Sequence, residues 1–62
     1  MLSNEELQQL KTLRVLYVED DADIREELTS FLRRRIGELL IAVDGQMGVK
    51  LWEEQTPDII IT

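Results

Sequence analysis

Three short apolar runs constrain the fold of this 62-residue chain more than any other feature. They cover residues 15–18 (VLYV), 39–43 (LLIAV) and 59–62 (IIIT), and β-branched residues are frequent in them. Each run is too short for a helix, and none alternates apolar with polar residues. Such continuous runs are typical of strands covered on both faces, as in parallel sheets. Buried helical segments are the alternative, and the polar residues that flank each run disfavour it.

The segment between the first two runs has the pattern of an amphipathic helix. Acids stand in its first turns and arginines in its last, as the helix dipole favours. Gly37 follows at the place where a left-handed cap is expected. Five apolar residues recur on one helical face: Ile24, Leu28, Phe31, Leu32 and Ile36.

A second helix is predicted between the second and third runs. Asp44 can cap its N-terminus. Gly48 lies on the face shared with Val49 and Trp52, where it either allows close approach to the sheet or is merely tolerated. Pro57 ends this helix, because a proline disfavours a helical residue before it.

The first twelve residues are predicted to form a separate helical extension, and residues 13–62 the α/β unit. Ser3 and Glu6 have the spacing of a capping box, and Leu7 and Leu10 follow at helical spacing. With Leu2, these leucines give too little pattern to separate a dimer contact from a plain packing extension, which is the favoured reading.

The element order is therefore α-β-α-β-α-β. Each strand-helix-strand unit is long enough for a crossover between parallel strands. This order predicts the first half of an open, doubly wound α/β sheet.

Composition narrows the function classes. The net charge of −6 argues against capture of nucleic acid or of an anionic membrane, and the run Arg33 to Arg35 is too short to reverse this. No apolar stretch approaches the length of a membrane span, and the N-terminus lacks a secretion signal, so a cytoplasmic protein is expected. Because the chain has no cysteine or histidine, any metal is expected to be a hard cation bound by oxygens.

An acidic cluster follows directly on the first apolar run. Glu19, Asp20 and Asp21 are expected at the carboxyl end of that strand, which is where open parallel sheets bind ligands. Neighbouring carboxylates repel one another unless a cation is present, and Mg²⁺ typically takes one or two carboxylates plus water and phosphate oxygens. Helix capping is the alternative, and it accounts better for Asp21 and Asp23 than for Glu19.

Three segments in this order resemble the first half of a response-regulator receiver domain of two-component signalling. They are residues 14–28 (RVLYVEDDADIREEL), 42–52 (AVDGQMGVKLW) and 57–62 (PDIIIT). The resemblance rests on a strand that ends in an acidic pair, on Arg25 in the next helix, on an A-x-D-G turn and on Pro-Asp before the third strand. It covers about residues 13–62.

The resemblance implies a flavodoxin-like fold, here truncated to its first three strands in the order 2-1-3, with an extra N-terminal helix. It also implies a phosphorelay in which a histidine kinase or phosphotransfer protein donates a phosphoryl group to an aspartate, with Mg²⁺ as cofactor. Asp20 would bind the metal directly, Glu19 would act mainly through metal-bound water, and Asp21 is a weaker candidate.

The phospho-accepting aspartate that the resemblance implies would stand at position 63, directly after Thr62. The 62 residues are therefore not expected to act as an enzyme or to accept phosphate, and they are expected to bind Mg²⁺ weakly. A fragment, a natural truncation or an unusual residue at position 63 would each account for this. Asp58 is expected roughly 13 Å from the active edge, as a solvated loop residue or local cap. Asp44 is expected to act as a helix cap.

Two other functions remain open. One is a non-catalytic interaction fragment that forms a homodimer through an exposed edge of the sheet and transfers no phosphate. The other is a nucleotide binder, which is disfavoured because residues 18–24 (VEDDADI) contain no glycine for a phosphate-binding loop.

Overall fold

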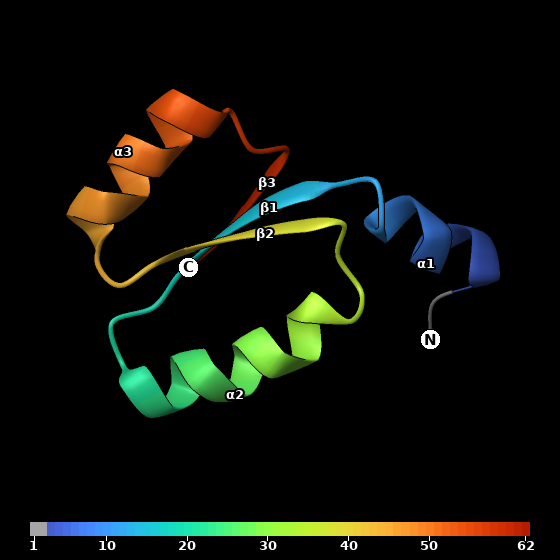
Figure 1. Cartoon of the computed structure of the whole chain (residues 1–62), viewed down its shortest axis with the longest axis horizontal. Coiled ribbons are helices and arrows are strands. Elements are labelled where there is room, and N and C mark those ends of the chain that lie inside the picture. Colours follow the sequence, from blue (N-terminus) through green and yellow to red (C-terminus); the bar gives the residue numbers. More distant parts are fainter. Residues whose placement is uncertain (1–2) are drawn as a thin grey trace.

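The computed structural model describes residues 3–62 and has the predicted element order (Figure 1). Leu2, considered above as part of a leucine pattern, lies outside the described residues. The helices are α1 (Asn4–Leu10), α2 (Ala22–Arg33) and α3 (Gly45–Gln55), and the strands are β1 (Arg14–Val18), β2 (Glu38–Ala42) and β3 (Ile59–Ile61).

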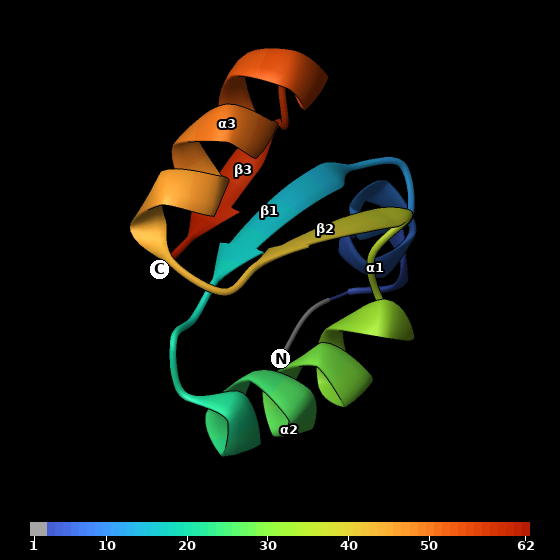
Figure 2. The same ribbon diagram turned by 60° about the vertical axis from the view of Figure 1, so that its left-hand side comes forward.

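The three strands form one parallel sheet in the order β2-β1-β3. This confirms the predicted α/β class and strand order. Because β1 has a strand on each side, it forms most of the core: Val15, Leu16 and Tyr17 are at most 2% exposed. α2 and α3 lie on opposite sides of the sheet in both views (Figures 1 and 2). Strand β1 is thus covered on both faces, by α2 on one side and by α3 on the other, as its continuous apolar run predicted.

Helix α3 packs closely on the sheet through a glycine. Gly48 is buried, and a Cβ added there would lie 2.9 Å from Cγ2 of Val18. The absent side chain lets the helix backbone approach β1. Of the two readings that the sequence left open for Gly48, close approach is confirmed.

Helix α2 covers its face of the sheet less completely. No residue of α2 is buried, and Ile24, Leu28 and Phe31 are 50%, 36% and 51% exposed. The predicted apolar face exists, but much of it contacts solvent in the described chain. Leu32 and Ile36, towards the end of that face, are half-buried.

Gly37 was predicted as a left-handed helix cap, and this prediction is wrong. Helix α2 ends earlier, at Arg33, with Arg34 as a C-cap of helical conformation, and no glycine among the described residues has a positive φ. Gly37 instead lies against the turn after α1, where an added Cβ would overlap the carbonyl oxygen of Lys11. The glycine is needed for space between two loops.

The predicted element ends need small corrections. β2 ends at Ala42 and does not include Val43, and β3 ends at Ile61. α3 ends before Thr56, as Pro57 predicted, and Thr56 takes the left-handed conformation with φ of 45°. There its backbone N–H donates to the carbonyl oxygen of Trp52 and closes the helix.

The N-terminal helix is confirmed as α1, which lies beyond the amino-terminal end of β1 (Figure 1). The side chains of Glu6, Leu7 and Leu10 are outside the described part of the chain, so the capping box stays a prediction. Over residues 3–62, no helix has both the length and the apolar character needed to cross a membrane.

Candidate functional site

The carboxyl end of β1 holds Glu19 in a fixed backbone position. The Glu19 N–H donates to the carbonyl oxygen of Ala42 at 3.1 Å, which continues the ladder one residue beyond β1. From the first turns of α2, Nη1 of Arg25 donates to the carbonyl oxygen of Glu19 at 2.9 Å, and this bond is partly buried. The β1–α2 loop is thus tied at its start to both the neighbouring strand and the following helix.

Asp21 is the N-cap of α2, as predicted. Its Oδ1 accepts from the N–H groups of Asp23 at 2.9 Å and Ile24 at 3.0 Å. Its own N–H donates to Oε2 of Glu19 at 3.2 Å. The backbone of the acidic loop is therefore organised by two of its own carboxylates, because a helix N-terminus offers N–H groups without helical partners.

Asp20 differs from its two neighbours. It is exposed, and in the described chain its side chain makes no hydrogen bond or ion pair. Both of its carboxylate oxygens are available to a ligand.

The side-chain oxygens at the carboxyl end of β1 are suitable ligands for a hard cation. Glu19 and Asp20 supply only oxygens, whereas Asp21 already uses one oxygen as a cap. Within residues 3–62, no three acidic, histidine or cysteine side chains gather closely enough to hold a metal. That finding concerns sets of three protein ligands, and Mg²⁺ is typically held by one or two carboxylates together with water. A magnesium role for Glu19, Asp20 and Asp21 stays a prediction.

Asp44 lies at the same edge, after β2, and caps α3. Its Oδ1 accepts from the N–H of Met47 at 2.8 Å, which confirms the predicted cap. Its carboxylate thus stabilises the start of α3.

Tyr17 is the last but one residue of β1, close to the acidic loop. The sequence pattern did not identify it as a candidate site residue. It is 2% exposed, and its hydroxyl is buried with no hydrogen-bond partner in the described chain. Burial raises the pKa of Tyr17, the carboxylate of Glu19 raises it further, Arg25 opposes this, and Asp21 adds a smaller increase. The signal available in the sequence is its spacing of two from Glu19, which places both side chains on one face of β1.

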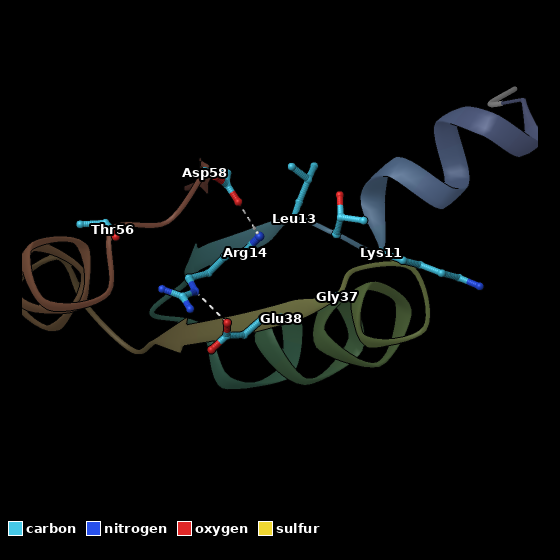
Figure 3. A pocket seen from close by; sticks show the side chains of 8 residues that line it. Lys11, Leu13, Arg14, Gly37, Glu38, Thr56 and Asp58 are labelled. Atoms are coloured by element: carbon cyan, nitrogen blue, oxygen red, sulfur yellow. Dashed lines mark hydrogen bonds and ion pairs between the residues drawn. The ribbon is translucent and has the colours of Figure 1, made fainter.

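The opposite, amino-terminal end of the sheet contains a pocket of about 300 Å³ (Figure 3). There the N–H of Arg14 donates to Oδ2 of Asp58 at 2.8 Å, and the N–H of Asp58 donates to the carbonyl oxygen of Arg14 at 2.8 Å. Nε of Arg14 pairs with Oε2 of Glu38 at 2.7 Å. The expectation that Asp58 lies away from the acidic edge is confirmed, but its carboxylate binds β1 and is not simply solvated.

The comparison of this chain with protein-family models, with curated proteins and with solved structures finds no match.

Proposed function

We propose that the chain is the amino-terminal part of a phosphorelay receiver module, in which Glu19 and Asp20 bind Mg²⁺ beside a phospho-accepting aspartate. The observation that carries the proposal is the acidic loop at the carboxyl end of the central strand. In the order β2-β1-β3, the connection through α2 leads from β1 to β2 on one side, and the connection through α3 then crosses to β3 on the other side, so this end of β1 is the switch point of the sheet. Three acids at that point, one of them without a partner among residues 3–62, suit a cation-dependent site.

The register between β1 and β3 supports the implied location of the acceptor. Val15 pairs with Ile59 and Tyr17 with Ile61. The same offset, extended by two residues, sets position 63 beside Glu19. An aspartate there would bring its carboxylate to the same edge of the sheet as the acidic loop.

Each residue of the loop has a distinct role in this proposal. Mg²⁺, when bound, would offset the charge between the accepting carboxylate and the phosphoryl oxygens. Asp20 is the direct ligand because its oxygens are available, and Glu19 holds metal-bound water. Asp21 and Arg25 position the loop, since their hydrogen bonds fix the backbone on both sides of Asp20.

Transfer would come from a phosphohistidine on a histidine kinase or phosphotransfer protein in the cytoplasm. This donor follows from the resemblance to receiver domains. An acceptor carboxylate needs no base of its own, which suits a chain without histidine.

Metal binding by the 62-residue chain tests the first half of the proposal. Trp52 and Tyr17 are the only residues of their kinds, so their fluorescence reports on α3 and on β1 separately. We expect weak, saturable Mg²⁺ binding that Asp20→Asn abolishes. Glu26→Gln is the matched control, because it removes one exposed acid from the same loop-helix unit outside the site. Equal binding by the Asp20→Asn variant would contradict the assignment.

Phosphorylation tests the second half. The chain extended through position 63 and the remaining half of a receiver domain is incubated with Mg²⁺ and a small phosphodonor, and its intact mass is measured. We expect one phosphoryl adduct that disappears when the aspartate at position 63 becomes asparagine, and no adduct on the 62-residue chain. Absence of any adduct on the extended chain would count against the receiver function.

A further inference from the structure

Tyr17 carries a buried hydroxyl near the carboxyl end of β1. The residue is 2% exposed, and its Oη makes no hydrogen bond to the part of the chain that the structure describes. Most buried polar groups in folded proteins are paired with protein or with water, because an unpaired one costs free energy. Phenylalanine would fill the same space without that cost. The hydroxyl is therefore best explained by a ligand that the chain itself does not supply.

This hydroxyl lies within reach of the acidic loop. The N–H of Glu19 still bonds to Ala42 as a ladder residue does, so Tyr17 and Glu19 have their side chains on one side of the sheet and their α-carbons roughly 7 Å apart. Burial raises the pKa of Tyr17 most. The charges of Glu19, Arg25 and Asp21 also act on this pKa, which indicates that the loop and the hydroxyl are close in space.

Most acceptors of the acidic loop are already occupied. The carbonyl oxygen of Glu19 accepts from Arg25, and Oδ1 of Asp21 accepts from two N–H groups at the start of α2. In the Glu19 carboxylate, Oε2 accepts from the N–H of Asp21, whereas Oε1 has no partner among residues 3–62. Oε1 and the Tyr17 hydroxyl are not bonded to each other. A gap between two such polar groups is commonly bridged by water.

We propose that the Tyr17 hydroxyl and the Glu19 carboxylate together hold one water of a hydrated cation, so that Tyr17 makes the site selective for Mg²⁺ over Ca²⁺. This inference rests on the proposed function, in which Asp20 binds the cation directly. A water whose lone pair is directed to a cation has two hydrogens to donate, and a phenol oxygen and a carboxylate oxygen can both accept. Tyr17 is thus a positioning residue that acts only through this water.

Hydration is the property by which such a pair of acceptors distinguishes the two cations. Mg²⁺ loses water reluctantly and usually keeps several waters in octahedral geometry. Ca²⁺ takes roughly six to eight oxygen ligands in flexible geometry and accepts bidentate carboxylates. Two acceptors that hold a water therefore favour Mg²⁺. Without the hydroxyl, the Glu19 carboxylate is free to approach the cation directly, which Ca²⁺ tolerates better.

Titration of the 62-residue chain with each cation, followed by the backbone amide signals of residues 19–21 in NMR spectra, tests the selectivity. Tyr17→Phe removes only the hydroxyl and is expected to weaken Mg²⁺ binding about tenfold and Ca²⁺ binding much less. Thr29→Val is the matched control, because it removes the other buried hydroxyl that has no partner among the described residues, and it should change neither affinity. Equal weakening for both cations would indicate a structural role of the hydroxyl and would overturn the proposal.

A double substitution tests whether Tyr17 and Glu19 hold the same water. Glu19→Gln removes the charge of the carboxylate and weakens its hold on a donor. If one water joins the two side chains, the second substitution should add little to the loss of Mg²⁺ affinity that the first one causes. Losses that simply add up in the Tyr17→Phe, Glu19→Gln double variant would show that the two residues act independently, against the proposal.

The same titrations separate a failure of this inference from a failure of the proposed function. If the wild-type chain binds neither cation, or if Asp20→Asn binds as the wild type does, both fail. If Asp20→Asn abolishes binding while Tyr17→Phe keeps the wild-type ratio of Mg²⁺ to Ca²⁺ affinity, only the role of Tyr17 is overturned. Tyr17→Phe breaks no hydrogen bond within the described chain, so urea unfolding without divalent ions should show a variant at least as stable as the wild type.

Discussion

At the amino-terminal end of the sheet, the backbone N–H of Arg14 donates to the Asp58 carboxylate and the Arg14 guanidinium pairs with the opposite charge of Glu38. At the carboxyl end, Glu19, Asp20 and Asp21 follow one another, and Asp20 has no partner among the described residues. The bonds that involve side chains join residues 24 to 44 positions apart at the first end and at most six apart at the second. One end closes the fold, and the other organises a loop.

This difference indicates where stability and function lie. The pocket at the amino-terminal end has a structural explanation, because Arg14 pairs with Glu38 and the Asp58 carboxylate accepts from the backbone N–H of Arg14. The carboxyl end keeps like charges together, which opposes folding unless a cation binds. Because this loop keeps repelling carboxylates together at the switch point of the sheet, it is a better candidate site than the amino-terminal pocket.

The largest expected effect is at Gly37. Gly37→Ala should lower the free energy of unfolding by about 3 kcal/mol, because the new Cβ meets the backbone oxygen of Lys11. Gly48→Ala should cost about 1 kcal/mol, since the neighbouring Val18 methyl group can shift. Gly45→Ala, with nothing within 4 Å, is the control. Urea unfolding measures all three, and equal losses at Gly37 and Gly45 would refute the role of the two-loop contact.

The pairing of Asp58 with β1 gives the next effect. Asp58→Ala should lower the free energy of unfolding by about 1 kcal/mol, because the N–H of Arg14 loses its acceptor. Asp58→Asn keeps an acceptor oxygen and should lose less. Glu38→Gln breaks only an ion pair between half-exposed side chains, so its cost should be at most about 0.5 kcal/mol. If Glu38→Gln lowered the free energy of unfolding most among the three variants, the bond from the Arg14 N–H to Asp58 would not be the main stabilising contact at this end.

At the carboxyl end, removal of a charge should not lower the free energy of unfolding, in contrast to the substitutions at the amino-terminal end. Without metal, Asp20→Asn should leave the free energy of unfolding unchanged or raise it by at most about 0.5 kcal/mol, because it relieves repulsion and breaks no hydrogen bond. Urea unfolding in the absence of divalent ions, run beside Asp58→Asn, compares the two ends directly. A clear loss of stability in Asp20→Asn would mean that the two ends do not differ as described.

Tyr17 gives the smallest effect at neutral pH. Its raised pKa means that the folded state favours the neutral hydroxyl, so its contribution to stability is complete below about pH 10 and is lost as pH rises further. Absorbance of the phenolate measures the titration. Glu19→Gln should lower its midpoint, whereas Glu38→Gln, at the other end of the sheet, should not. Identical midpoints in both variants would remove Glu19 as a cause.

Much of the local structure could be predicted from residue patterns. The apolar runs mark the three strands, and Asp21 and Asp44 cap the helices that follow, because their side chains act on N–H groups two or three residues away. The acidic edge could be predicted too, since the carboxyl end of a strand is defined by the strand itself. The role of Arg25 could not, because its bond to Glu19 depends on how α2 returns along the sheet.

The sequence by itself determined the elements, the N-caps of α2 and α3 and the concentration of acids after β1, since these depend on contacts within a few residues. Only the tertiary structure decided that Asp58 pairs with Arg14, that Gly37 makes room for Lys11, and that the buried hydroxyl of Tyr17 has no partner in the part of the chain that the structure describes. Each of these depends on segments that approach one another only after the sheet has formed. Spacing along the chain carries no signal for such contacts, because they are set by the distance between strands and loops in space.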